Sequence, residues 1–504
     1  MSKFLYGTAI QGIQSFILQT NKLREIVGAS EMVAHICSRL FYELLTRQRF
    51  KSDKELEDAM GGDKNLIVHA AGNIKFIFED RSECERIVRE FPKLVVEYAP
   101  GITVSQAVVE YEGDFASAVV ELENNLAVQR NKPARSATLG LMGIARSRQT
   151  GLPSVVRDGI NGLLDDSTWK KRNNSNRRGG LFARAFGSFP DASRIAFDLS
   201  KLTTEDNSWI AVIHADGNGL GSIVQKIGDS PIRFKKFSED LDKATTAAAQ
   251  KAFTIVCGGL DPDAIIPIRP IVLSGDDLTV ICRADIAIPF TKAFLKAFEE
   301  KTAEFKLITK EDRIFTGGTI HDRMTACAGI AFVKASYPFY YAYRLAESLC
   351  NEAKKDAKDK PSIREGSELP QSCLLFHKVR DSFTEDYEEI VRRELSPKPG
   401  MKLNFGPYYI SGKDSRWTVE QLMKKASDLE GEKGNTVKNT IRQWLALLFR
   451  NSGQETQLLE RAQQLYKSER TDGRLALLES AVKPLTEGGP VPAYDLLVVN
   501  SLIC

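Results

Sequence analysis

The chain has 504 residues, of which 42% are hydrophobic and 27% charged, and its formal net charge is +3. This profile is typical of a globular protein of about three or four domains, and it excludes a disordered or fibrous chain. The balanced charge gives no general argument for nucleic acid or a membrane as a partner. No apolar run is long enough to cross a bilayer and no signal peptide is recognisable, so a cytoplasmic protein without membrane attachment is expected.

The first 130 residues predict elements in the order β-α-β-β-α-β-α, from their hydrophobic periodicity and turn residues. The expected strands are 3–10 and 102–111, the hairpin is 65–80, and the helical segments are 13–47, 82–98 and 114–129. The next distinctive segment, 167–187, is basic, rich in Asn and Gly and poorly periodic. It is interpreted as an exposed loop, with a solvated linker favoured over an RNA or phosphate contact.

The same order of elements is predicted again further along the chain. The strands are 208–216, 264–274, 278–284 and 324–336, and the helices are 233–256, 289–306 and 338–358. This is the ferredoxin-like arrangement used by palm domains, and its repetition suggests two copies of one domain. After residue 372 the pattern turns mostly helical, over 384–395, 418–429, 439–451 and 455–467.

The expected fold class is therefore α+β, with two ferredoxin-like palm domains and a helical C-terminal domain. The predicted boundaries are 1–135 for a degenerate first palm, 136–205 for a connecting region with the basic loop, 206–371 for a catalytic second palm, and 372–504 for the helical domain.

The chemistry is expected at the hairpin "IRPIVLSGDDLTVICRAD", where Asp276 and Asp277 stand between two apolar strands. Asp216 ends the preceding strand of the same unit, and the strand order predicts that these three carboxylates converge. For the Asp pair alone, an ordinary polar turn is the favoured alternative. Carboxylates together with a nucleoside triphosphate suit Mg²⁺ or Mn²⁺, as in palm enzymes that join nucleotides with two metal ions.

Glycines in "HADGNGLG" allow the backbone to approach phosphates closely, so Gly217, Asn218 and Gly219 are predicted to bind nucleotide. Their spacing differs from that of a dinucleotide-binding loop. Lys354 is placed to reach the β- or γ-phosphate, although a lysine at such a position is more often part of a solvated helix face. The His321-Asp322 pair is interpreted as a chance occurrence rather than a nuclease site.

Four motifs in this order carry a family resemblance: "GIQSFILQTNKLREIVGAS", "HADGNGLG", "SGDD" and "TACAGIAFVKASYPFYYAYRLAESLCNEAKK". The chain resembles the large palm-polymerase subunit of type III CRISPR effector complexes, which is similar in turn to GGDEF cyclases. The resemblance implies that Asp216, Asp276 and Asp277 bind the metals, that Ser274 and Gly275 form the turn under the phosphates, and that Lys354 contacts phosphate. It also implies synthesis of cyclic oligoadenylates from ATP as an antiviral second messenger, with two nucleotides held between facing palms.

The chain departs from that family at three points. It starts at the first palm, so the HD nuclease domain is expected to be absent, and no cysteine lies between Cys84 and Cys257 to bind zinc between the palms. Ser274 replaces the first glycine of the usual GGDD motif. A short stand-alone synthase is therefore expected, with nucleoside triphosphates as ligands. CRISPR-type subunits, guide or target RNA, and a homo-oligomer stay open as partners.

The first unit has no carboxylate in its "HAAGN" hairpin, so it is expected to bind no catalytic metal. Its polar residues Asn73, Lys22 and Ser30 are predicted to hold a second nucleotide, with a role in packing alone as an equal alternative. For the whole protein, the alternative to a nucleotidyltransferase is a non-catalytic scaffold that binds nucleotide or RNA.

Overall fold

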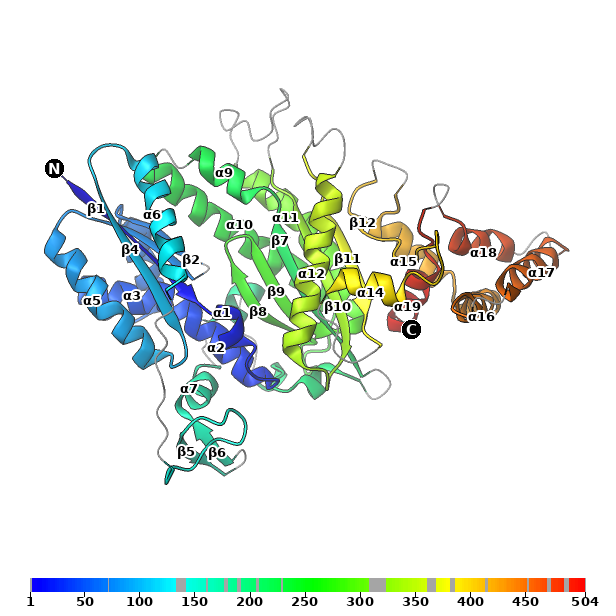
Figure 1. Cartoon of the computed structure of the whole chain (residues 1–504), viewed down its shortest axis with the longest axis horizontal. Coiled ribbons are helices and arrows are strands. Elements are labelled where there is room, and N and C mark those ends of the chain that lie inside the picture. Colours follow the sequence, from blue (N-terminus) through cyan, green and yellow to red (C-terminus); the bar gives the residue numbers. More distant parts are fainter. Residues whose placement is uncertain are drawn as a thin grey trace.

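Two units of mixed α and β structure lie next to each other along the long axis of the molecule, and a group of helices follows them (Figure 1). The computed structural model describes residues 2–70, 72–132, 142–159, 162–175, 180–187, 192–204, 208–227, 230–307, 323–359, 369–380, 386–412, 416–450, 453–468, 473–484 and 489–503. The His321-Asp322 pair falls outside these residues. None of the helices within them is long and apolar enough to cross a bilayer.

The first unit contains a four-stranded antiparallel sheet in the order β2-β3-β1-β4. Its strands are β1 (Lys3–Gln11), β2 (Leu66–Ala70), β3 (Asn73–Phe78) and β4 (Thr103–Tyr111). Its helices are α1 (Ile13–Ile17), α2 (Leu23–His35), α3 (Phe41–Thr46), α4 (Asp53–Gly62), α5 (Arg81–Tyr98) and α6 (Phe115–Arg130). The predicted order of elements is confirmed, and the segment predicted as one helical region is divided among α1, α2, a π-helical turn and α3.

The second unit contains a six-stranded sheet in the order β12-β11-β10-β7-β9-β8. The strands are β7 (Trp209–Gly217), β8 (Ile268–Ser274), β9 (Asp277–Arg283), β10 (Ala326–Lys334), β11 (Cys373–Lys378) and β12 (Tyr408–Tyr409). The helices are α9 (Leu220–Ile227), α10 (Pro231–Cys257), α11 (Ala284–Glu304) and α12 (Phe339–Lys358). Four neighbouring strands that include the β8 edge, in the order β8-β9-β7-β10, repeat the order of the first sheet, as expected for the second set of elements.

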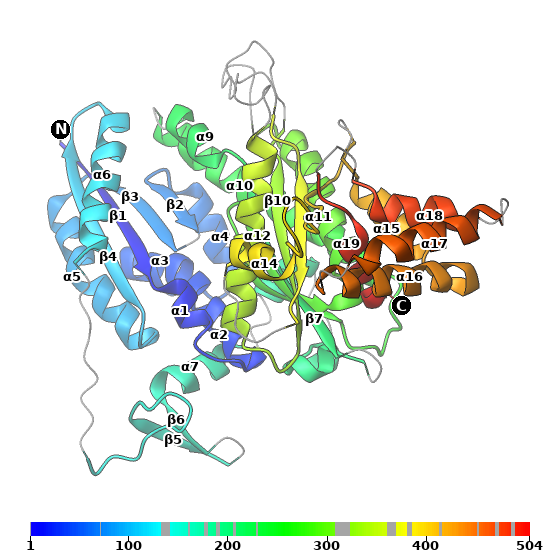
Figure 2. The same ribbon diagram turned by 45° about the vertical axis from the view of Figure 1, so that its right-hand side comes forward.

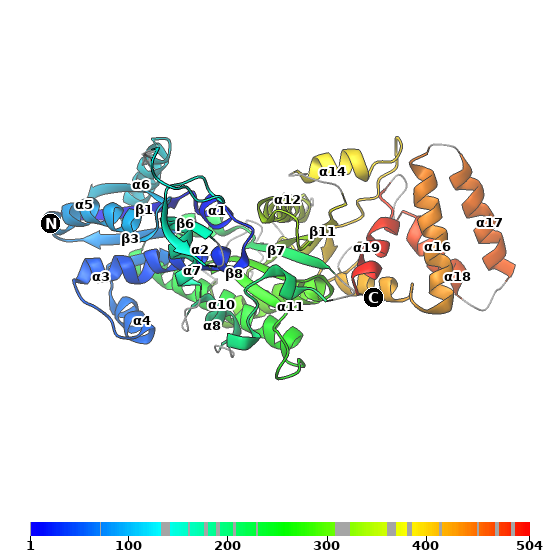
Figure 3. The same ribbon diagram turned by 90° about the horizontal axis from the view of Figure 1, so that it is seen from below.

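Helices cover both faces of this second sheet, with α12 on one side and α10 and α11 on the other (Figure 3). The strands β7 and β10 are almost wholly buried between these layers. Close packing of α12 depends on Gly329 of β10, where a Cβ would come 2.0 Å from the carbonyl oxygen of Ala346. Because helices pack against both faces of the sheet, the positions of both ends of β7 are fixed.

The prediction that the chain turns helical after residue 372 missed β11, which pairs in parallel with β10. Its six residues are too short an apolar run to separate from a buried helix turn by periodicity. The later helices are confirmed as α14 (Tyr387–Glu394), α15 (Val419–Ser427), α16 (Gly431–Leu448) and α17 (Gln454–Ser468), followed by α18 (Arg474–Val482) and α19 (Ala493–Ile503). Figure 2 shows α15 to α19 at the end of the molecule opposite the first sheet.

The connecting region is not the exposed basic loop that was predicted over 167–187. It forms the hairpin β5 (Ser154–Asp158) and β6 (Gly162–Asp165), then α7 (Asp166–Asn174) and α8 (Leu181–Phe186). Asp165 caps α7 by accepting a hydrogen bond from the Thr168 backbone N–H at 3.1 Å. Two of the basic residues, Lys171 and Arg172, are buried. The prediction is wrong because it treated basic composition as a sign of solvation, whereas these cations have internal partners.

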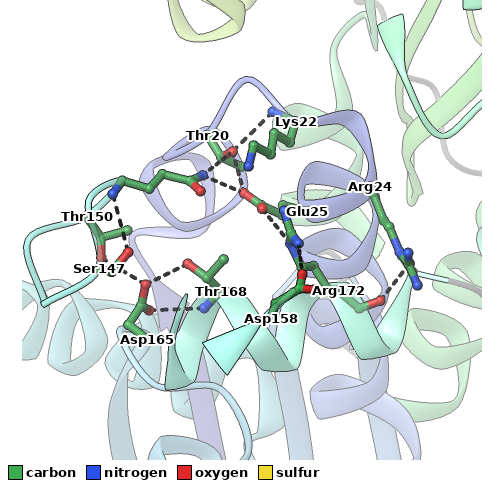
Figure 4. Close-up of polar contacts among 12 residues, drawn as sticks. Thr20, Lys22, Arg24, Glu25, Ser147, Thr150, Asp158, Asp165, Thr168 and Arg172 are labelled. Atoms are coloured by element: carbon green, nitrogen blue, oxygen red, sulfur yellow. Dashed lines mark hydrogen bonds and ion pairs between the residues drawn. The ribbon is translucent and has the colours of Figure 1, made fainter. Parts of the chain in front are cut away.

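A buried ion pair anchors α7 to α2 of the first unit (Figure 4). Arg172 Nε lies 2.7 Å from Glu25 Oε1, and Arg172 Nη1 lies 2.9 Å from Asp158 Oδ2. Gln149 Nε2 donates to Glu25 Oε2 at 2.7 Å and to Thr20 Oγ1 at 2.9 Å. The Glu25 side chain is only 1% exposed, so its charge depends on these donors.

We expect Arg172→Ala to lower the free energy of unfolding by about 3 kcal/mol, because it leaves the Glu25 carboxylate buried without its main counter-ion. Denaturant unfolding of the whole chain measures the loss. The matched control is Arg392→Ala, whose side chain is 81% exposed and whose partner Glu389 lies 3.8 Å away. That control should change stability by less than about 0.5 kcal/mol. Equal losses in the two variants would contradict the buried-pair account.

Candidate metal centre and adjoining cavity

The end of β7 lies beside the tip of the β8–β9 hairpin, because β7 and β9 are antiparallel neighbours. His214 pairs with Thr279 and Ala215 with Leu278, so the next residues along the two strands, Asp216 and Asp277, lie close together. Side chains alternate along a strand, so His214 and Asp216 point to the same face. Ligand atoms of His214, Asp216 and Asp277 all lie within 4.8 Å of one another. The predicted convergence of carboxylates from β7 and the hairpin is therefore seen, with an imidazole added.

His214 was missed by the sequence analysis, although it precedes Asp216 by the two-residue period that places strand residues on one face. Its ring is buried, its Nδ1 lies 3.1 Å from Thr279 Oγ1, and Tyr343 of α12 packs edge-on against it. Burial lowers the pKa of the imidazole although Asp216 opposes this, so the ring is neutral near pH 7. A neutral imidazole whose Nδ1 is engaged by Thr279 offers Nε2 to a cation.

Asp276 lies deeper than its neighbour Asp277 and is 8% exposed. Its carboxylate packs over Gly217, where a Cβ would come 2.7 Å from Asp276 Oδ2. Burial, and then the charge of Asp216, raise the pKa of Asp276 to about 7. Burial, and then Asp276 and Asp216, also raise the pKa of Asp277 well above its usual range. The three carboxylates therefore repel one another, and a bound cation would relieve that repulsion.

We expect Asp276→Asn to stabilise the metal-free protein at pH 8. Since folding raises the pKa of Asp276, stability is greatest below the unfolded pKa near 4 and falls as the pH rises towards 7. Asparagine cannot ionise, so the variant avoids the free-energy cost of ionising a buried carboxyl group at pH 8. The gain should be on the order of 2 kcal/mol, about half of what the pKa shift alone implies, because the new amide does not make all of its hydrogen bonds in this site.

This gain should shrink as the pH falls and be smallest near pH 3, below the unfolded pKa, where Asp276 is mostly protonated in both states. Thermal or denaturant unfolding in a chelator across this range measures it. Asp263→Asn, at an exposed position before β8, is the control and should show no such dependence. A gain that did not vary with pH would contradict the assignment of a raised pKa.

Lys354 of α12 reaches the metal centre from the face that α12 covers. Its ammonium group pairs with Asp216 Oδ2 and donates to the Gly217 carbonyl oxygen at 2.9 Å. Burial alone lowers the pKa of this lysine, but the Asp216 carboxylate outweighs burial and the pKa is raised. Lys354 is therefore a permanent positive charge beside the carboxylates, not part of a solvated helix face.

The hairpin turn and the loop after β7 are shaped by two glycines with positive φ, Gly275 at 63° and Gly219 at 77°. Gly275 N–H donates to Asp242 Oδ1 of α10 at 3.3 Å, which fixes the turn. Asn218 points inward, since its side chain is 3% exposed and its Nδ2 donates to Thr325 Oγ1 at 3.0 Å. Within the described part of the chain, its Oδ1 has no hydrogen-bond partner. In this structure Asn218 links the loop to β10.

A cavity of about 850 Å³ opens beside the centre, between the two units. Ser274 and Asp277 line it from the second unit, and Ser30, His69 and Gly72 line it from the first. Its size is within the range of pockets that hold small-molecule ligands. The hairpin turn of the first unit thus faces the same space as the acidic hairpin.

Of the three residues of the first unit that were predicted to bind nucleotide, Ser30 lines this cavity and the other two do not. Ser30 lines the cavity, but its hydroxyl donates to the Ile271 carbonyl oxygen of β8, so it also joins the units. Lys22 and Asn73 are not among the described residues that line the cavity. Lys22 lies before α2, where its backbone N–H donates to Thr20 Oγ1 at 3.1 Å, and Asn73 begins β3 opposite Ala9.

Comparisons with known proteins address the second unit most directly. Residues 209–364 match the family described as Cas10/Cmr2, second palm domain. No curated protein sequence matches the chain.

Solved structures with a similar fold include chains of Csm1–Csm4 cassettes. One, in complex with pppApApA, has a TM-score of 0.54 at 15% identity, covering 99% of this chain and 69% of that one. The apo cassette has a TM-score of 0.51 at 15% identity, covering 100% and 70%. The cassette with one ATP has a TM-score of 0.50 at 13% identity, with the same coverage of 100% and 70%. The resemblance predicted from the sequence motifs is confirmed: residues 209–364 match the second palm domain of the Cas10/Cmr2 family, and the fold of the whole chain is similar to that of the Csm1–Csm4 cassette chains.

Proposed function

We propose that this protein is a metal-dependent nucleotidyltransferase that condenses nucleoside triphosphates, with ATP as the expected substrate, into cyclic or linear oligonucleotide messengers for antiviral defence. The observation that carries the proposal is the group of His214, Asp216 and Asp277 beside a cavity of about 850 Å³ in a Cas10/Cmr2 second palm domain. Chains of similar fold have been solved with pppApApA and with ATP, which supports a nucleotide as the ligand.

We propose the following division of the chain. Residues 1–135 form a degenerate first palm, 136–205 a connecting region, 206–371 the catalytic palm and 372–504 a helical C-terminal domain with β11 and β12 at its start. The shared strand order of the two sheets supports the first and third of these assignments.

The donor set fits a divalent cation such as Mg²⁺ or Mn²⁺. Asp216, Asp276 and Asp277 would hold the metal, with His214 as a further ligand. Burial and mutual repulsion raise the pKa values of Asp276 and Asp277 although Lys354 lies nearby, and cation binding would relieve that repulsion. A bound cation would act there as a Lewis acid for the attacking and leaving oxygens of phosphoryl transfer.

The remaining roles belong to the chain itself. Lys354 would turn partly away from Asp216 when nucleotide binds, and its ammonium group would then lie near the β- and γ-phosphates. The backbone at Gly217 and Gly219, ahead of α9, would approach the phosphates closely, and Asn218 would hold that loop to β10. Ser274 and Gly275 would form the turn beneath the triphosphate.

A second nucleotide is proposed to lie against the first unit, where Ser30, His69 and Gly72 line the shared cavity. This second nucleotide would present a hydroxyl group to the nucleotide at the metal centre, and the first unit would lower the reaction barrier by orienting that hydroxyl group. Asn73 and Lys22 would act indirectly, by positioning the hairpin and the start of α2.

The alternative is a non-catalytic scaffold that binds nucleotide or RNA within a CRISPR-type assembly. One observation favours it: Lys354 already pairs with Asp216, so this carboxylate has a protein partner without a metal. A scaffold of this kind would bind nucleoside triphosphate but release no pyrophosphate.

The deciding experiment incubates the purified chain with each nucleoside triphosphate and Mg²⁺ or Mn²⁺, with and without RNA. Pyrophosphate release and mass spectrometry of the products are followed. Oligoadenylates from ATP, lost in Asp216→Asn and retained in Asp263→Asn, are the expected result. Nucleotide binding without pyrophosphate release under all these conditions would instead support the scaffold.

A further inference from the structure

A second charged site lies at the other end of β7 from the metal centre. Trp209 begins this strand, and the ammonium groups of Lys334 and Lys378 each lie 4.4 Å from its ring centroid. Lys378, Arg380 and Arg442 line a pocket of about 350 Å³ between β11 and helices α16 and α19. From Trp209 to Asp216 the strand spans roughly 23 Å, so this pocket is separate from the metal centre.

The cations in and beside this pocket have no acidic partner in the described part of the chain. Among the described residues, Lys334, Lys378, Arg380 and Arg442 form no ion pair with a carboxylate, and the lysines bond only hydroxyls. Lys334 Nζ donates to Ser208 Oγ at 2.6 Å and Lys378 Nζ to Ser501 Oγ at 2.8 Å. By contrast, Lys398 in the same part of the chain forms an ion pair, with its Nζ 2.7 Å from Glu455 Oε1.

Holding these charges together has an electrostatic cost. Burial, followed by repulsion from Arg380 and Lys334, lowers the pKa of Lys378 to about 8. The neighbouring imidazole of His377 is buried, and its Nδ1 has no hydrogen-bond partner among the described residues. An anion in the pocket would satisfy the cations and remove their mutual repulsion.

We propose that this pocket binds the phosphate groups of a single-stranded nucleic acid, with a base stacked on Phe449. Phe449 lines the pocket and is 50% exposed, so its ring is available for stacking beside the cations. Cations that track a phosphate backbone beside an exposed ring are the common means of holding single strands without reading sequence. The two arginines supply planar donors that match phosphate oxygens.

The test measures fluorescence anisotropy of a short labelled oligoribonucleotide of mixed sequence with the whole chain, across a salt series. The variant Arg380→Ala/Arg442→Ala should bind about tenfold more weakly, and its salt slope should fall by about 1.4, since each single-strand phosphate contact contributes about 0.7. Phe449→Ala should weaken binding with the slope unchanged, because stacking releases no counter-ions.

The matched control, Lys424→Ala/Lys433→Ala, removes two exposed cations from α15 and α16 outside this pocket and should bind as the parent does. Equal weakening in control and variant would show general charge attraction and overturn the site. Competition by ATP or tripolyphosphate as effective as that by the strand would overturn the strand as occupant in favour of a small polyphosphate. Asp216→Asn should leave this binding unchanged, so failure here is distinguishable from failure of the proposed catalysis.

Discussion

Asp277→Asn is expected to weaken Mn²⁺ binding at least about 100-fold, the upper end of what is lost when a residue that merely supports a metal ligand is removed. Asp277 is one of the three residues whose ligand atoms lie within 4.8 Å, and it also lines the cavity. Its replacement removes one of the anionic ligands and keeps the shape of the side chain. Electron paramagnetic resonance of free Mn²⁺ measures binding without any need for turnover.

The control for this variant is Asp263→Asn, which removes a carboxylate from an exposed turn of the same unit. It should bind Mn²⁺ as the parent protein does. His214→Gln should weaken binding less than Asp277→Asn, because it removes a neutral ligand. Unchanged Mn²⁺ affinity in Asp277→Asn would rule out the metal centre described above, whatever the protein does with nucleotides.

Gly28→Ala should cause the largest loss of stability, about 4 kcal/mol or more, or prevent folding altogether. Gly28 lies where α2 crosses α7, and a Cβ there would come 1.6 Å from the Lys171 carbonyl oxygen. Backbone cannot move aside as a flexible side chain can, so the two helices would have to separate. Their separation would also break the Glu25–Arg172 ion pair.

Gly61→Ala is the matched control, because Gly61 also lies in a helix of the first unit and a Cβ there meets nothing within 4 Å. Its effect should stay within about 1 kcal/mol and should favour the helix. Denaturant unfolding, or the yield of soluble protein if Gly28→Ala fails to fold, gives the comparison. Similar stability of the two variants would contradict the close approach of α2 and α7.

The order of elements in both sheets could be predicted because it rests on local patterns. The apolar runs around Asp276 and Asp277 define β8 and β9 without reference to the rest of the chain, and the long amphipathic segments define α10, α11 and α12. The convergence of Asp216 with the hairpin followed from that order, since neighbouring antiparallel strands bring their ends together.

Other features depended on partners that are distant in sequence. Arg172 and Lys171 looked like solvated charges until Glu25 and the carbonyl oxygen of Phe16 were seen to pair with them. Asn218 looked like a ligand of phosphate, but Thr325 draws its side chain inward. The strand β11 became recognisable only as a neighbour of β10.

The sequence by itself determined two β-α-β-β-α-β-α units and the carboxylates of Asp216, Asp276 and Asp277, because strand period, helix period and turn residues act over a few neighbours. Only the tertiary structure decided that His214 joins those carboxylates, that Lys354 neutralises Asp216, and that the two units enclose one cavity. Burial of a charge is stable only with a partner, and that partner is supplied by folding from another part of the chain.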